Sequence, residues 1–243
     1  MTALFLLLLL QSAPAGPQLQ AEYDRCIDQA VDDPLAGVAT ATSWSLAGGG
    51  YLARQCLGLA YAAQQRWAAA GEAFEEAARA AERVREPRTA NYWAQAGNAW
   101  LAAGNVTRAR GALDAALAAG TLTGQALGEA HLDRARILAA AGDATGARGD
   151  LDLALRHAPA DPLAWLLSAT LARRGGDLNR AATDIAEAMQ RAPDDASVQL
   201  EAGNIAALRG DQSGAIAAWQ SAARLGGDGA VATAARAALA QFN

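Results

Sequence analysis

Apolar stretches and polar corners alternate along the chain at a nearly constant interval. Four corners consist of a glycine followed by Asn or Asp, and an alanine stands five residues after each glycine. The corners are Gly104-Asn105, Gly142-Asp143, Gly176-Asp177 and Gly210-Asp211, and the alanines are Ala109, Ala147, Ala181 and Ala215. Glycine readily adopts the left-handed conformation that ends a helix, and Asp or Asn can cap the free N–H groups that begin the next helix. Each corner therefore predicts a helix–turn–helix.

Aligning the sequence on the corner alanines gives five copies and three further positions, here called columns, at which the residues are alike in size. In the first copy, Gln65-Arg66-Trp67 stands in place of the glycine corner, and Ala70 is the corner alanine. A small residue precedes the corner alanine by twelve positions, a bulky residue follows it by four, and a second alanine follows it by seven. These columns are Gly58, Gly97, Ala135, Ala169 and Gly203; Phe74, Leu113, Leu151, Ile185 and Trp219; and Ala77, Ala116, Ala154, Ala188 and Ala222. The small column has spacings of 39, 38, 34 and 34, which indicates a period near 34 residues with insertions after the first two copies.

This pattern resembles the tetratricopeptide repeat, W-x2-L-G-x2-Y followed by A, F, A and P. The first copy matches it with Leu57-Gly58-x-x-Tyr61, and the fourth matches it with Trp165 and Pro193. The resemblance covers most of the chain. It implies an all-α, right-handed superhelical solenoid of about five helix–turn–helix repeats. The predicted copies are residues 51–84, 90–123, 128–161, 162–195 and 196–229.

Both ends of such a solenoid need a capping segment, because each end otherwise exposes an apolar face. Residues 16–50 predict an N-terminal helical cap with helices over 21–31 and 34–46. Asp33-Pro34 is a good start signal for the second helix, and three consecutive glycines follow it as a stop. Residues 230–243 predict a C-terminal capping helix.

Residues 1–15 form an apolar unit of their own. The uninterrupted apolar run over 3–10 is followed by Ala13 and Ala15, which stand where signal peptidase reads small residues. The run is too short for a spanning helix, which needs about 20 residues. We expect a cleaved secretory signal and a periplasmic or secreted protein. A misassigned start or an apolar tail is the alternative.

Composition and charge exclude several classes of function. Alanine dominates the apolar residues, and it favours helices because it loses no side-chain entropy in them. The formal net charge of −5 is spread along the chain without a basic patch, so nucleic-acid binding is not expected. Nor do we expect a membrane span, a cofactor or a small-molecule substrate.

Few residues offer catalytic or metal-binding chemistry. The two histidines, His131 and His157, and the two cysteines show no metal-ligand spacing. His131 is expected in the first turn of its helix and His157 at the end of one, both in structural roles. The acidic pair Glu75-Glu76 is interpreted as solvated charge. Three tryptophans are interpreted as packing residues rather than a ligand cage: Trp93, Trp100 and Trp165. The sequence therefore predicts a protein that is not an enzyme.

Cys26 and Cys56 are predicted to form a disulfide. One lies on the predicted N-terminal cap and the other on the first helix of the first repeat, and an exported protein reaches an oxidising compartment. Two buried reduced thiols are the alternative.

The repeat family implies an interaction scaffold whose first helices line a concave groove for a peptide or protein partner. An envelope assembly factor that acts through its outer face or its caps is the alternative. Positions 2, 5, 9, 12 and 13 of each repeat are implied to face the groove. The candidate partner-binding residues at these positions are Asn91, Asn98, Arg136, Thr170, Arg173, Arg174 and Asn204. Asn can both donate and accept hydrogen bonds with a peptide backbone, and Arg can hold a carboxylate at two points.

Overall fold

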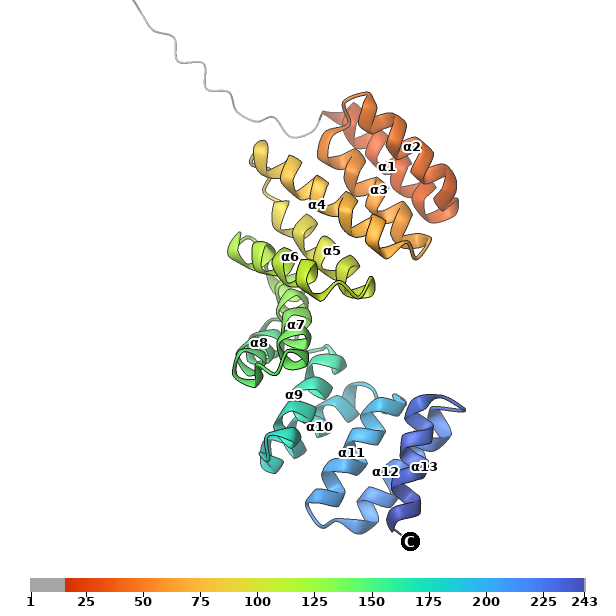
Figure 1. Ribbon diagram of the computed structural model, residues 1–243, viewed down its shortest axis with the longest axis vertical. Helices are drawn as coiled ribbons and strands as arrows, with labels where there is room; N and C mark the ends of the chain where they lie inside the picture. The colour runs from red at the N-terminus through yellow and green to blue at the C-terminus, as the bar shows by residue number, and fades with distance from the viewer. Residues whose placement is uncertain (1–15, 243) are drawn as a thin grey trace, which may run out of the picture. The chain divides into compact units, whose positions relative to one another are not determined.

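A computed structural model describes residues 16–242, and the predicted signal at 1–15 lies outside the described residues (Figure 1). Within this range the chain forms thirteen α-helices and no strand. The all-α prediction is confirmed. The chain divides into two compact units, and the boundary between them follows Gly104.

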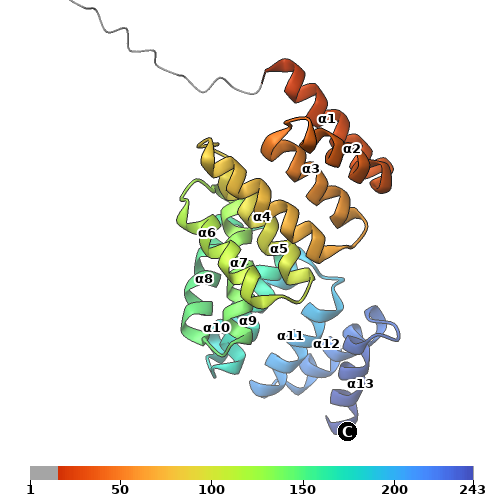
Figure 2. The ribbon, with the colours of Figure 1, turned by 45° about the horizontal axis from the view of Figure 1, so that its top comes forward.

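Five helices form the N-terminal unit, and neighbouring helices pack side by side (Figures 1 and 2). Helix α1 packs on both α2 and α3, and α4 lies between α3 and α5. The helices are α1 (Pro17–Asp32), α2 (Pro34–Leu46), α3 (Gly50–Ala63), α4 (Trp67–Arg83) and α5 (Thr89–Ala102). Helix α1 thus begins earlier than the predicted residue 21.

Eight helices form the C-terminal unit, and most of them pair as antiparallel hairpins. Helix α7 pairs with α8, α9 with α10, and α11 with α12, while α13 covers α11 and α12. The first helices of the hairpins also touch, because α9 contacts both α7 and α11. The helices are α6 (Val106–Ala118), α7 (Gly124–Ala140), α8 (Ala144–His157), α9 (Pro162–Arg174), α10 (Leu178–Arg191), α11 (Ala196–Leu208), α12 (Gln212–Leu225) and α13 (Ala230–Phe242).

The corners have the local chemistry that their sequence predicts. Glycine takes a positive φ at each of them, for example +83° at Gly142 and +82° at Gly176. The side chains of Asp143 and Asp177 then accept hydrogen bonds from backbone N–H groups in the first turn of α8 and α10. In the corner without glycine, Gln65 adopts the left-handed conformation at φ 57°.

The small columns of the repeat let the two helices of a hairpin approach closely. The corner alanines and the second alanine column are fully buried in every copy. Gly58 faces the ring of Phe74, and a Cβ added to this glycine would lie 2.5 Å from the ring. Gly203 faces the Trp219 indole in the same way, at 2.4 Å. The bulky column therefore fills space that the small column leaves.

Helix α7 corrects one detail of the sequence interpretation. It begins at Gly124 rather than at residue 128, so His131 lies in the middle of the helix and not in its first turn. The histidine is 8% exposed. None of the helices in residues 16–242 is long and apolar enough to cross a bilayer.

Candidate interaction surface

In the N-terminal unit, Asn91 and Asn98 lie on α5, and both side chains are exposed. They are available to an external partner. A row of polar side chains from α1, α3 and α5 lies beside these two asparagines, and the sequence did not predict it.

This row joins three helices through one glutamine. The Tyr23 hydroxyl donates to Gln55 Oε1 at 2.8 Å, and Gln55 Nε2 donates to Gln95 Oε1 at 3.1 Å. Burial raises the pKa of Tyr23 above its usual value, so its hydroxyl keeps its proton at neutral pH. Gln55 is the fifth residue of the first predicted repeat, a position that the repeat family places in the groove. The repeat position could therefore have identified Gln55 as a groove residue from the sequence.

A second polar cluster lies at the start of α5. Glu86 accepts a hydrogen bond from the Tyr51 hydroxyl at 2.8 Å, and it forms an ion pair with Arg88 at 2.7 Å. Burial by itself would raise the pKa of Glu86, but these hydrogen bonds more than offset it and hold the pKa below its usual value. Tyr92, buried beside Tyr51, has a raised pKa because of its burial. At neutral pH Glu86 is therefore ionised, and the hydroxyls of Tyr51 and Tyr92 are protonated.

In the C-terminal unit, three predicted residues line one depression between α7 and α9. They are Arg136, Thr170 and Arg174, with Leu167 and Leu171 beside them. Arg136 is exposed and also pairs with Asp133 at 3.1 Å, one turn earlier on α7. Arg174 is exposed, and its side chain forms no hydrogen bond or ion pair within the described residues.

The structure gives two other predicted residues internal partners. Arg173 donates to both carboxylate oxygens of Glu201, at 2.6 and 3.2 Å, and so ties α9 to α11. Asn204 accepts a hydrogen bond from the Trp219 indole at 3.1 Å. Both side chains form hydrogen bonds between helices, so they are less available to a partner than Arg174 is.

A buried ionic network surrounds His131 on α7. Asp150 on α8 is 3% exposed and lies 2.9 Å from His131 Nδ1. Arg134 donates to both oxygens of Asp150, at 2.7 and 2.8 Å, and to Asp114 on α6 at 3.0 Å. Burial would raise the pKa of Asp150, but the hydrogen bonds from Arg134 and His131 outweigh it and lower that pKa. The network joins α6, α7 and α8.

Helices α8, α9 and α10 share a second network around a buried serine. The Ser168 hydroxyl donates to Asp184 at 2.5 Å, and Arg148 donates to the Ser168 hydroxyl at 2.6 Å and to its carbonyl at 2.9 Å. Arg180 pairs with Asp184 and with Asp152 on α8. These charges hold one hairpin against the next.

One acidic residue of α4 is not the solvated charge that the sequence suggested. Glu75 is 6% exposed, accepts from the Trp100 indole at 2.8 Å and pairs with Arg79 at 3.0 Å. Trp100 is buried, as its packing interpretation requires. Trp165 is only partly buried, and its indole donates to the Pro159 carbonyl at 2.8 Å.

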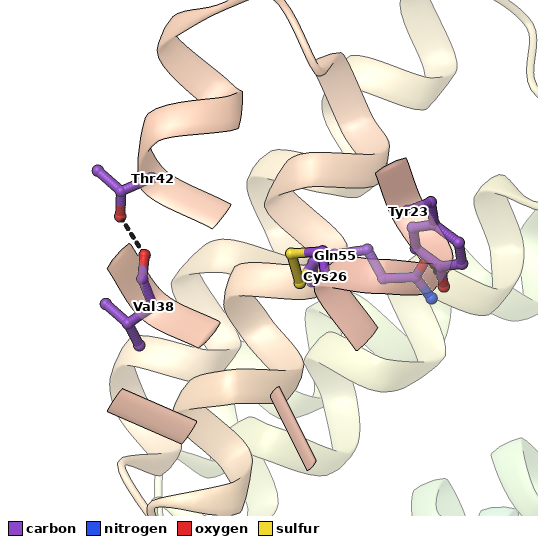
Figure 3. Close-up of a disulfide and its surroundings, with 6 residues drawn as sticks. Tyr23, Cys26, Val38, Thr42 and Gln55 are labelled. Atoms are coloured by element: carbon purple, nitrogen blue, oxygen red, sulfur yellow. Dashed lines mark hydrogen bonds between the residues drawn. A yellow bond between two sulfur atoms is a disulfide. The ribbon is translucent and has the colours of Figure 1, made fainter. Parts of the chain in front are cut away.

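Cys26 on α1 and Cys56 on α3 are joined by a disulfide, with Cα atoms 6.1 Å apart (Figure 3). Both residues are fully buried, and the bridge lies next to the hydrogen bond between Tyr23 and Gln55. The bridge fixes the N-terminal helix to the first hairpin. No group of three or more metal-ligating side chains occurs within residues 16–242.

Comparison with protein families decides the classification. The tetratricopeptide repeat model matches residues 57–123, 95–164 and 166–242, which together make up more than half of the chain. The chain belongs to the tetratricopeptide repeat family. A search of curated proteins gave no significant match.

Solved structures of tetratricopeptide repeat type share the fold at low sequence identity. PilF of Pseudomonas aeruginosa has a TM-score of 0.75 and 13% identity, over 91% of this chain and 99% of that one. PilW, a type IV pilus biogenesis factor, has a TM-score of 0.71 and 17% identity, over 90% of this chain and 98% of that one. YrrB, described as having an unusual peptide-binding site, has a TM-score of 0.61 and 16% identity, over 81% of this chain and 96% of that one.

Proposed function

We propose that this chain is a non-enzymatic scaffold that binds a peptide or protein partner on the first helices of its repeats. The observation that carries the proposal is the depression between α7 and α9, where the exposed Arg174 lies beside apolar side chains. The peptide-binding site described for YrrB supports such a use of this fold. The exposed Asn91 and Asn98 offer further contacts on α5.

We further propose, from the export signal predicted at residues 1–15, that this activity takes place in the periplasm or outside the cell. The similarity of the fold to PilW, a type IV pilus biogenesis factor, is in keeping with an envelope setting.

A second candidate function is envelope assembly through the N-terminal cap. Helix α2 carries no charged residue, and Leu35 and Leu46 on it are 73% and 87% exposed. An uncharged outer face with exposed leucines is suited to contact with another protein.

Site-specific photo-crosslinking separates these functions. A photoreactive residue is placed at Asn98 on α5 and Thr170 on α9, at Arg156 on α8 and Ala217 on α12, and at Leu46 on α2. We expect crosslinks to a common partner from Asn98 and Thr170 but not from Arg156 or Ala217. Crosslinks from Leu46 alone would favour the cap, and crosslinks from Arg156 and Ala217 alone would favour assembly through the outer face and contradict binding on the first helices.

A further inference from the structure

Two surface depressions of the C-terminal unit meet at the end of α7 and α9. One has a volume of about 290 Å³ and is lined by residues of α7 and α9, with Leu151 of α8. The other, of about 560 Å³, reaches to the corners that follow these helices. Ala139, Leu171 and Arg174 line both. We call the surface around these three residues the α7–α9 notch.

Arg174 differs from the other arginines that line the notch, because each of those has a partner on the protein. Arg136 pairs with Asp133, Arg148 is bound to Ser168, and Arg180 pairs with Asp152 and Asp184. Asp177 is the acidic residue that lines the notch, and its side chain caps α10. The Arg174 guanidinium thus presents its hydrogen-bond donors to the solvent.

Two of the arginines around the notch repel each other. Burial of its side chain, together with repulsion from Arg180, lowers the pKa of Arg148. A negative charge placed beside these arginines relieves that repulsion. Asp133, Asp152 and Asp184 are already engaged by arginines, so they repel such a charge less than free carboxylates would.

The floor of the notch is apolar and open. Leu171 and Leu167 are half-buried, and Ala139 is exposed on α7. A small residue at position 139 leaves space above Leu171 that an apolar side chain of a partner can fill. The half-buried Thr170 hydroxyl lies at the edge of the same depression and can bond to a peptide backbone.

We infer that the α7–α9 notch binds an acidic peptide segment, with an Asp or Glu side chain on Arg174 and a neighbouring apolar side chain on Ala139 and Leu171. Arg binds a carboxylate through two parallel hydrogen bonds, which fixes both position and direction. This inference rests on the proposed function and specifies the chemistry of the partner.

The probe is a phage-displayed library of random dodecapeptides, selected on the full chain. We expect enriched peptides to carry Asp or Glu within two positions of Leu, Ile or Phe. The tightest peptide is then synthesised with its acid changed to Lys, or with its apolar residue changed to Ser, and binding is measured by fluorescence anisotropy. Each change should weaken binding by about tenfold.

Protein variants locate the peptide on the molecule. Arg174→Glu should weaken binding by at least about tenfold, and the peptide with Lys in place of its acid should recover affinity on this variant. Ala139→Phe fills the notch without changing charge and should weaken binding as much. Arg156→Glu is a matched control, because Arg156 is also an exposed arginine in the last turn of its helix. Ala217→Phe on α12 is the control for added bulk.

Two outcomes overturn the inference. Peptides that bind equally well to the wild type, Arg174→Glu and Ala139→Phe would bind elsewhere, and the absence of any enriched peptide would show that the notch has no such affinity. In either case the proposed function is tested separately, because crosslinking from Asn98 and Thr170 detects a partner whatever its chemistry. Circular dichroism melting of each variant confirms that lost binding is not lost folding.

Discussion

Single glycines set the distance between paired helices in this protein. Gly203 on α11 is buried against the Trp219 indole of α12, and no side chain fits between them. Gly149 on α8 is also helical, but nothing lies within 4 Å of the position of its missing Cβ. The same residue type therefore serves packing at one site and only weakens the helix at the other.

Gly203→Ala is predicted to destabilise the protein by about 1 to 3 kcal/mol, because the methyl group overlaps the Trp219 ring. Gly149→Ala is predicted to stabilise it by about 0.5 to 1 kcal/mol, because alanine restricts the unfolded chain and favours the helix. Urea denaturation of both variants measures the two effects. Equal changes of the same sign would contradict this account of Gly203.

Asp150→Asn is predicted to cost about 2 to 3 kcal/mol at pH 7, because Arg134 loses its buried partner. The pKa of Asp150 is lower in the folded protein than in the unfolded chain. Its contribution to stability is therefore complete above the unfolded value of about 3.9 and is lost as the pH falls through the folded value.

Urea denaturation at pH 7 and in steps from pH 5 to pH 3 tests this prediction. The wild type should lose stability faster than Asp150→Asn as the pH falls below about 4. Asp114→Asn is the control: this half-exposed acid also pairs with Arg134, and its loss should cost less than about 1 kcal/mol. A constant difference between wild type and Asp150→Asn at all pH values would rule out the charge of Asp150 as the cause.

Helix α1 is held in the N-terminal unit by a covalent link. The disulfide joins α1 to α3, whereas α2 packs on both of these helices through apolar contacts of Val38 and Trp44 and through a buried glycine, Gly37, against Ala30. The helices of the later repeats are held by apolar clusters, such as the one that includes Ile185 and Val198, together with the ionic networks described above.

Thiol titration of the denatured, unreduced protein is predicted to find no free thiol. Replacing both cysteines, Cys26→Ser and Cys56→Ser, should lower stability by about 3 to 4 kcal/mol, since the bridge closes a separation of 30 residues. Reductant should destabilise the wild type but not the double variant. Two titrated thiols in the unreduced wild type would show that the bridge does not form in solution.

At the scale of the whole molecule, the chain consists of two compact helical units preceded by an apolar segment at residues 1–15. We propose that this segment directs export. The compartment matters to the other proposals, because the disulfide needs an oxidising environment.

Residues 1–20 fused to a reporter that is active only outside the cytoplasm are predicted to give an active reporter. A mature chain beginning near Gly16 should be released. Leu7→Arg interrupts the apolar run and should abolish the activity, because a charge in that run opposes insertion. An inactive wild-type fusion would contradict export.

The sequence by itself determined the fold class and the family. Glycine with a neighbouring Asp or Asn, small columns such as Gly58 and Gly203, and bulky residues such as Trp219 act over one corner or one hairpin. These interactions are local, and they recur in four copies for the glycine corner and in five for the small and bulky positions, so the period could be found in the sequence. The binding role of the groove residues stays a prediction.

The tertiary structure alone decided which polar side chains have internal partners. Arg173 and Arg174 are adjacent in sequence, but Arg173 reaches Glu201 on α11 while Arg174 is exposed beside Leu171. Asp150 similarly meets Arg134 and His131 on another helix. Successive residues of a helix point about 100° apart, so their partners depend on how distant helices pack. That packing is absent from the local pattern, and it separates a residue that links two repeats from one that can bind a partner.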